Sequence, residues 1–441
     1  MQEIRVGIIG CGRPRQQAGA TGYGMAHYHV AGYKAHPRVR LVALADTDRE
    51  NAEAFRALHG SERLYVDYHA MLANERLDMV SVCLWPHLHA PAVIAAAESG
   101  VRAIHCEKPM APTYGEAQAM LAACERRGVQ LTIDHQRRFA QPFRRARELI
   151  LAGAIGTLQR LEAVCSNLFD WGTHWFDMLN FLNGDQPVEW VLGQVEGRGG
   201  ARVFGVPVEG QGLSQFSYAN GVLGMLVTGV DGALGGADIR ALGSLGTLEV
   251  RNEAQPLRVW AQGDADWRVV PTSGGFHGME LVKLAILDAL NCLETGRQSE
   301  LAGAKALRAS ELTFATYESS RRRGRVELPL TIDDSPLLVA GGVRDEHLEH
   351  EAIDLRLGER PGRPGQVPAA QQGRELLAPL AEGLVHQPPE QREVAHRMGR
   401  CGVRHQPYHG GIHLRRWAER PRRLEEEILR AAEVLHHHRQ P

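Results

Sequence analysis

The sequence predicts an α/β domain with a parallel sheet, followed by an α+β domain with a mostly antiparallel open sheet and an irregular C-terminal tail. Three observations support this division. Apolar runs alternate with helical stretches through residues 1–134, strand-like runs joined by short turns dominate residues 135–336, and residues 337–441 show weak hydrophobic periodicity. Strands alternating with helices of roughly 10–15 residues indicate βαβ units, whereas strands joined by tight turns indicate antiparallel pairing.

The first domain is expected to contain five strands and four helices. The strands are predicted at 4–9, 40–46, 79–84, 103–106 and 130–134, and the helices at 24–35, 49–59, 89–99 and 113–127. Several of these strands are nearly continuous apolar runs, which is typical of a parallel sheet covered by helices on both faces.

The second domain is expected to be built mainly from strands. These are predicted at 158–166, 188–198, 212–218, 222–228, 239–242, 247–250, 257–261, 268–270 and 326–330, with two long helices at 278–294 and 303–323. The sequence Tyr-Ala-Asn-Gly at 218–221 indicates a hairpin turn.

The tail has a composition unlike that of the rest of the chain. Residues 341–441 hold 10 of the 21 histidines and 16 arginines, but no lysine and no phenylalanine. We expect disorder or an unrelated extension, with a reading-frame error past residue 336 as a further hypothesis. The i, i+4 spacing of His405, His409 and His413 permits metal affinity, and 424–435 could form an isolated amphipathic helix, but disorder is favoured.

Bulk properties exclude several functional classes. A formal net charge of −2 predicts no general attraction for nucleic acid or anionic membranes. The seven cysteines form no CxxC pair, which argues against a zinc cluster and a disulfide framework and fits the reduced cytoplasm. The N-terminus shows no signal peptide pattern, and no apolar window is long enough to predict a membrane span.

A glycine turn follows the first predicted strand. Gly10 and Gly12 stand where one glycine permits a tight turn and a second lets the backbone approach a pyrophosphate at a helix N-terminus. The insertion RPRQQAGAT displaces the third glycine, and Arg13 within it is expected to reach a phosphate. The alternative is a plain glycine turn, but the repeated βαβ context favours a dinucleotide-binding Rossmann domain.

Asp46 closes the second strand, where a carboxylate can accept hydrogen bonds from the adenosine ribose. A carboxylate would repel a 2′-phosphate, so NAD is favoured, while nearby Arg49 keeps NADP open. The alternative reading of Asp46 is a helix N-cap.

Lys108 lies in the sequence HCEKP (105–109), at the end of another predicted parallel strand. Ligands bind beyond the carboxyl ends of such strands, so Lys108 is expected to hold a substrate hydroxyl. The alternative is an ion pair between Glu107 and a neighbour, with Lys108 merely exposed.

Asp170, His174 and Asp177 recur at i, i+4 and i+7 and would share one face of a helix. Histidine is the usual proton acceptor for alcohol oxidation near neutral pH, and Asp170 could orient it or bind substrate. A structural histidine and a metal site are the alternatives. We expect no metal, because no third ligand type is nearby.

Together these motifs resemble the glucose–fructose oxidoreductase / inositol dehydrogenase / rhizopine-catabolism (Gfo/Idh/MocA) family. The resemblance rests on GIIGCG (7–12), ALAD (43–46), CEKP (106–109) and DWGTHWFD (170–177), with support from GSLGTLEV (243–250) and LDALNCLETGR (287–297), and covers about residues 3–336. It implies NAD(P)-dependent hydride transfer to or from a sugar, inositol or related polyol, and a second domain that carries the substrate pocket. It also implies a homo-oligomer, either a dimer or a tetramer.

The resemblance assigns roles residue by residue. Lys108 matches the motif lysine, Asp170 its aspartate and His174 its general acid/base, and the Lys108–Pro109 bond is expected to be cis. Trp85-Pro86 replaces the usual Thr-Pro, which would alter cofactor stacking. The expected cofactor-binding residues are Gly10, Gly12, Arg13, Asp46, Trp85, Pro86, His89, Glu107 and Lys108, with His89 matching a position near the nicotinamide.

Three further residues and two other functions remain open. Gln136, Arg137 and Arg138 fall where relatives place pocket or hinge residues, the alternative being a solvated basic helix start. Some relatives are redox-neutral glycoside hydrolases that keep NAD bound, and others are non-catalytic dinucleotide-binding regulators. The intact Lys108, Asp170 and His174 set argues against a regulator.

Overall fold

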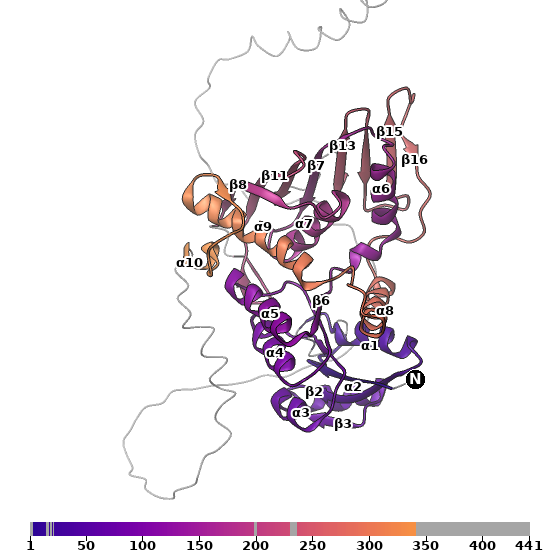
Figure 1. Ribbon diagram of the computed structural model, residues 1–441, viewed down its shortest axis with the longest axis vertical. Helices are drawn as coiled ribbons and strands as arrows, with labels where there is room; N and C mark the ends of the chain where they lie inside the picture. Colours follow the sequence, from indigo (N-terminus) through magenta and orange to yellow (C-terminus); the bar gives the residue numbers. More distant parts are fainter. Residues whose placement is uncertain are drawn as a thin grey trace, which may run out of the picture. The chain divides into compact units, whose positions relative to one another are not determined.

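The computed structural model describes residues 3–14, 17, 20, 22–197, 201–229 and 236–340, and all of them belong to one compact unit. Two sheets form the framework of this part, with helices between them and around the first sheet (Figure 1). The predictions for the tail beyond residue 340 and for residues 15, 16, 18, 19 and 21 of the insertion lie outside the described residues.

The first sheet has six parallel strands in the order β3-β2-β1-β4-β5-β6. Its strands are β1 (Ile4–Ile9), β2 (Val39–Ala45), β3 (Arg63–Tyr65), β4 (Met79–Val82), β5 (Ala103–Cys106) and β6 (Gln130–Ile133), and its helices are α1 (Ala26–Ala35), α2 (Arg49–His59), α3 (Tyr68–Asn74), α4 (Pro86–Glu98) and α5 (Tyr114–Arg127). The predicted doubly wound parallel sheet is confirmed. The winding reverses between β1 and β4, which is where such sheets bind ligands.

The sequence reading missed β3 and α3. β3 is only three residues long and its side chains are exposed or half-buried, so it leaves no apolar run in the sequence. β4 and β5, in contrast, are buried at every position and were readily predicted.

The second sheet has nine strands in the order β16-β15-β14-β13-β7-β12-β11-β8-β17. Its strands are β7 (Leu158–Cys165), β8 (Val188–Glu196), β11 (Gln211–Tyr218), β12 (Leu223–Thr228), β13 (Ile239–Gly243), β14 (Gly246–Val250), β15 (Leu257–Ala261), β16 (Arg268–Val269) and β17 (Val326–Glu327). Only the pair β7–β12 is parallel, so the predicted mostly antiparallel sheet is confirmed. The predicted hairpin joins β11 to β12, and Gly221 in its turn has φ +81°.

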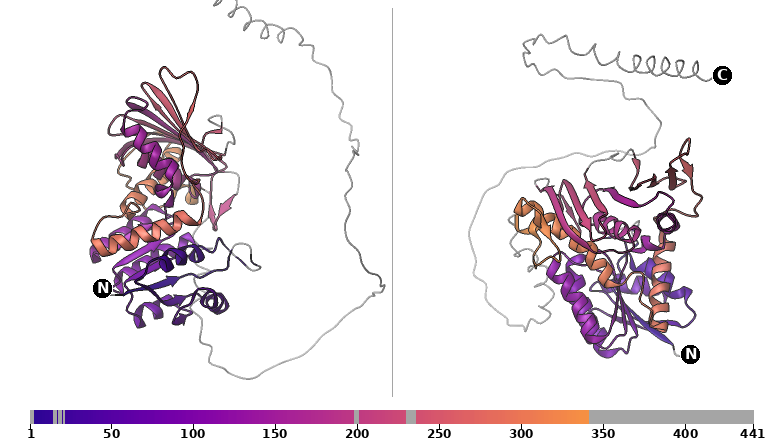
Figure 2. Two further views of the ribbon diagram at one scale, coloured as in Figure 1. Left: turned by 90° about the vertical axis from the view of Figure 1, so that its right-hand side faces the viewer. Right: turned by 45° about the horizontal axis from the view of Figure 1, so that its top comes forward.

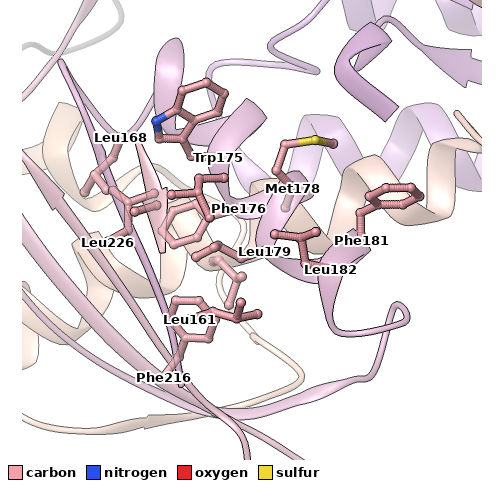
Figure 3. Packing of buried hydrophobic residues seen from close by; sticks show 14 of the residues in the cluster. Leu161, Leu168, Trp175, Phe176, Met178, Leu179, Phe181, Leu182, Phe216 and Leu226 are labelled. Carbon is pink, nitrogen blue, oxygen red and sulfur yellow. The ribbon is translucent and has the colours of Figure 1, made fainter. Parts of the chain in front are cut away.

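Helices α7 (Trp171–Leu182) and α9 (Gly303–Arg322) lie against one face of this second sheet (Figures 1 and 2). Every second residue of β11 is buried, which is the alternation expected when one sheet face packs on a core. Figure 3 shows Phe176 and Leu179 of α7 packing against strand residues such as Phe216. The Phe176 and Phe216 rings lie edge to face with centroids 5.7 Å apart. Helix α7 is therefore anchored by its apolar side.

Two segments that follow β16 in the chain contact the first domain. α8 (Met279–Thr295) packs on α1 so closely that a Cβ at Gly32 would lie 2.5 Å from the Cβ of Ile286. An isolated antiparallel bridge pairs Thr132 of β6 with Ala302. These contacts fix the two sheets against each other around a shared cavity. The remaining described elements are η1 (Gln136–Phe139), α6 (Gln141–Leu151), the short hairpin β9 (Arg202–Val203) and β10 (Val206–Pro207), and α10 (Pro336–Ala340).

A membrane-spanning helix would need a long, apolar stretch, and none of the helices in the described part of the chain meets that requirement.

Candidate active site

A cavity of about 430 Å³ lies at the carboxyl ends of the parallel strands. One wall comes from the loop after β1, the start of α4 and the loop after β5. The other comes from η1, α7, the β9–β10 hairpin and the residues before α8. The cavity is therefore shared by the domain of the first sheet and the second domain.

The glycine turn has the geometry that close approach of a ligand requires. Gly10 has φ +85°, and a Cβ there would lie 2.6 Å from the Cys83 carbonyl oxygen, so only glycine fits this turn. Gly12 has φ +57°, and a Cβ there would meet only the Gly24 Cα, at 3.7 Å. Gly12 lines the cavity and Gly10 supports it from behind. The turn therefore leaves room for a ligand to approach its backbone closely.

Asp46 is tied to this turn. Its Oδ2 accepts hydrogen bonds from the backbone N–H groups of Cys11 and Gly12, at 2.8 and 3.0 Å. The N-cap of α2 is Asp48, whose carboxylate accepts from the Glu50 and Asn51 N–H groups. The N-cap alternative for Asp46 is therefore wrong. Its carboxylate lies beside the glycine turn.

Arg13 lines the cavity, but its side chain extends toward the start of α2. Its Nε donates to Asn51 Oδ1 at 2.6 Å, and its Nη2 lies 3.6 Å from a Glu50 carboxylate oxygen. Its expected contact with a phosphate stays a prediction.

Lys108 and Asp170 meet although 62 residues separate them in the chain. Lys108 follows β5 and Asp170 stands at the N-cap of α7, and the Lys108 Nζ donates a hydrogen bond to Asp170 Oδ1. The Lys108–Pro109 bond is cis, as the resemblance implies. Because the Lys108 side chain is only 18% exposed, the alternative of a merely exposed lysine is wrong.

His174 lies one turn further along α7 and lines the same cavity. It is buried, and its Nδ1 has no hydrogen-bond partner within the described residues. Burial holds the pKa of His174 well below its usual value, and the charges of Arg137 and Lys108 lower it further. The imidazole is therefore neutral near pH 7 and able to accept a proton.

Asp177 does not join this group. It binds Arg138, whose Nε and Nη2 lie 2.8 to 3.0 Å from its carboxylate oxygens. The remaining guanidinium bonds go to Asp185. Burial alone would raise the pKa of Asp177, but the Arg138 charge outweighs it and brings the pKa to about 2. Arg138, 1% exposed, is thus a structural residue, and a solvated basic helix start at this position is wrong.

Arg137, the preceding residue, faces the cavity. Its guanidinium carbon lies 5.3 Å from the ring centroid of Trp171 and 5.0 Å from that of Trp175. Its Nη2 lies 3.2 Å from Nδ1 of His277. Burial lowers the pKa of Arg137 to about 10, so the group stays protonated near pH 7. Gln136 also lines the cavity, which fits the pocket position that the resemblance suggests.

Trp85, Pro86 and Glu107 line the cavity as well, whereas His89 is not among its lining residues. The two ring nitrogens of His89 lie 2.8 Å from the Pro109 carbonyl oxygen and 3.0 Å from that of Leu84. His89 therefore holds together the loops that carry Lys108 and Trp85.

Sequence reasoning missed several aromatic residues of the cavity wall. Phe204, at the tip of the β9–β10 hairpin, lies 5.9 Å from Lys108 Nζ and has ring contacts with Tyr23 and Trp85. No sequence signal marks it, because the hairpin belongs to neither sheet. Trp171 stands inside the predicted motif, and His277 directly precedes the turn into α8.

A buried polar cluster lies behind Glu107. One nitrogen of His29 is 2.9 Å from Glu107 Oε1 and the other is 3.0 Å from the Ser81 hydroxyl. Donor atoms of His29, His105 and Asp134 lie within 4.8 Å of one another, an arrangement that could hold a metal ion. Because Ser81 and Glu107 already engage both His29 nitrogens, we read this cluster as structural. Burial, together with the nearby Glu107 carboxylate, raises the pKa of Asp134 to about 8.

Comparison with known proteins gives consistent results. Residues 4–135 match the GFO_IDH_MocA model, described as an oxidoreductase family with an NAD-binding Rossmann fold. The D-apiose dehydrogenase of Paraburkholderia graminis is 28% identical over 78% of this chain and 96% of its own length. The D-glucoside 3-dehydrogenase of Escherichia coli is 30% identical over 35% of this chain and 41% of its own length.

Solved structures share the fold. A levoglucosan dehydrogenase in complex with NADH and L-sorbose superposes with a TM-score of 0.64 at 22% identity, covering 75% of this chain and all of that protein. At this identity the comparison shows a shared fold, and the matched part of the chain includes both domains.

Proposed function

We propose that the chain is a member of the Gfo/Idh/MocA oxidoreductase family and that it transfers a hydride between a hydroxyl-bearing carbon of a sugar, inositol or related polyol and C4 of a nicotinamide. The observation that carries this proposal is the convergence of Lys108, Asp170 and His174 in one cavity beside the glycine turn. An ammonium group, a carboxylate and a neutral imidazole are the groups that oxidation of an alcohol requires.

The residues around the turn fit a dinucleotide. The open space in front of Gly12 suits a pyrophosphate, and Asp46 beside it suits ribose hydroxyls. A carboxylate at that position favours NAD over NADP. When bound, NAD would supply the hydride acceptor for alcohol oxidation. The cytoplasmic location and the homo-oligomeric state remain predictions.

The protein's own groups then manage the proton and the developing charge. Neutral His174 accepts the hydroxyl proton of the substrate. The Lys108 ammonium group donates a hydrogen bond to the substrate oxygen and stabilises its negative charge. Asp170 holds Lys108 in place through their ion pair. The aromatic rings of Phe204 and Trp85 restrict water at the mouth of the cavity.

The test is a turnover screen of the full chain with NAD and NADP against aldoses, inositols, alditols and sugar acids. We expect net formation of reduced nicotinamide, measured by absorbance, with at least one substrate class and with NAD preferred. Product release from a glycoside without net reduction would instead indicate the redox-neutral hydrolase. Binding of NAD without turnover of any compound would indicate a regulator.

A further inference from the structure

Arg137 is a buried cation without a carboxylate partner. It is 5% exposed, and neither its Nε nor its Nη1 finds a hydrogen-bond partner among the described residues. Within that same part of the chain, no carboxylate oxygen comes within ion-pairing distance of its guanidinium. Burying an unpaired charge is costly, so a group from outside the chain is expected to supply the counter-charge.

The surroundings of Arg137 hold it in position without neutralising it. The rings of Trp171 and Trp175 lie beside the guanidinium, and Nδ1 of His277 lies 3.2 Å from its Nη2. Burial lowers the pKa of His277 to about 4, so this imidazole is neutral at pH 7 and can accept the Nη2 hydrogen bond. The nearest acidic residue on the same wall, Asp170, is already bound by Lys108. Among the described residues the charge of Arg137 is therefore unpaired on the wall of the cavity, where a negatively charged ligand can balance it.

A carboxylate suits this place, because it accepts charge-assisted hydrogen bonds from a guanidinium. A single positive charge balances one carboxylate. A phosphate carries more charge, and the neutral imidazoles of His174 and His277 add no second cation at this place. Arg137 belongs to η1 on the second-domain wall of the cavity, whereas the pyrophosphate of a dinucleotide is expected at the glycine turn on the other wall, so the substrate rather than the cofactor is the expected partner.

We infer that the substrate is a polyhydroxy acid, an aldonate or uronate, whose carboxylate binds Arg137 while the hydroxyl to be oxidised meets Lys108 and His174. This inference rests on the proposed function and narrows its substrate class. The two indole rings and His277 hold the guanidinium in position, so the carboxylate fixes which hydroxyl of the sugar reaches His174.

The experiment uses pairs of compounds that differ only by a carboxylate, such as D-galacturonate with D-galactose and D-gluconate with D-sorbitol. Initial rates are measured for the full chain, for Arg137→Met and for Arg137→Lys. For the wild-type chain we expect kcat/KM for the best acid to exceed that of its neutral partner by on the order of 100-fold, the worth of charge-assisted hydrogen bonds in a buried site. Arg137→Met should abolish this ratio, and Arg137→Lys should retain part of it.

The outcomes separate the inference from the function on which it rests. Turnover of neutral sugars in preference to acids, or an equal loss for both in Arg137→Met, would overturn the inference and leave the dehydrogenase intact. No turnover of any compound would overturn the proposed function. Hexose 6-phosphates form a third arm, and a preference for them over the acids would overturn the carboxylate assignment.

A binding measurement checks the same contact without turnover. The full chain with bound NADH is titrated with D-galacturonate and D-gluconate while the cofactor fluorescence is followed. We expect saturation by at least one acid in the wild-type chain and a large loss of affinity in Arg137→Met. Equal affinity in the two proteins would contradict the inference, and circular dichroism of the variant confirms that it is folded.

Discussion

Two ionic clusters of this protein are built from the same two elements, η1 and α7, yet they differ in how completely their charges are paired. The Arg138 cluster, formed by Arg138, Asp177 and Asp185, satisfies every guanidinium nitrogen. The cavity cluster, in contrast, leaves Arg137 without a carboxylate and His174 Nδ1 without a partner among the described residues. Buried polar groups that serve structure are normally paired, so the incomplete cluster is the one adapted to a ligand.

Local geometry explains how neighbouring residues come to serve different purposes. In a 3₁₀ helix consecutive residues point roughly 120° apart, so Arg137 faces the cavity while Arg138 faces the interior. Along α7 a rise of about 1.5 Å per residue puts Asp177 roughly 10 Å from Asp170. Asp170 and Asp177 therefore lie on one face of α7 but belong to different sites.

The largest expected effect is on catalysis in the cavity cluster. His174→Ala removes the proton acceptor and should lower kcat by about 10²–10⁴-fold. Binding of NADH, followed by its fluorescence, should stay unchanged because His174 does not touch the glycine turn. Activity equal to that of the wild-type chain would remove His174 from the proposed role.

The second expected effect is a difference in unfolding free energy between variants of Arg138 and Arg137. Arg138→Met leaves the buried Asp177 carboxylate unpaired and should cost about 3–5 kcal/mol of unfolding free energy. Arg137→Met removes an unpaired buried charge and should leave the unfolding free energy within about 1 kcal/mol of wild type, or raise it. Chemical denaturation of the two variants in parallel measures the difference. Equal losses would show that both arginines are structural and would weaken the distinction between the clusters.

The same residues show how much of the candidate site could be predicted from the sequence alone. The meeting of Lys108 and Asp170 was predictable, because each lies in a motif whose place at a strand end or helix start the hydrophobic pattern indicates. The separation of Asp177 from that site was not predictable, because neither interpretation of Arg138, a pocket or hinge residue or a solvated helix start, made it the buried partner of Asp177. Likewise, nothing in the sequence placed Phe204 or His277 in the cavity, because only tertiary packing brings these loops to it.

The fold, too, was predictable only in part. Strands with continuous or alternating apolar residues were found from their periodicity, whereas β3 was missed because its short run is half-exposed. The packing of α8 on α1 was also hidden, since it depends on the missing side chain of Gly32 facing Ile286 rather than on any repeat in the sequence.

The smallest expected effect is on the pH profile, and it tests whether the unpaired charge acts on the base. The pKa of His174 lies well below 6.5 because of burial and then because of the Arg137 and Lys108 charges. A lowered pKa keeps the imidazole neutral, and so able to accept a proton, at pH values below 6.5. For a neutral substrate, kcat/KM should therefore stay flat from pH 8 to about 6.5, the ordinary histidine value, and continue flat below it.

Arg137→Met removes one of the charges that depress this pKa, so the acidic limb of the profile should move to higher pH in that variant. Arg137→Lys keeps the charge and should leave the limb close to its wild-type position. The readout is the pH of half-maximal kcat/KM with one neutral sugar in all three proteins. An unchanged limb in Arg137→Met would mean that burial alone sets the pKa of His174, and the two clusters would then differ in ligand binding but not in how they tune the proton acceptor.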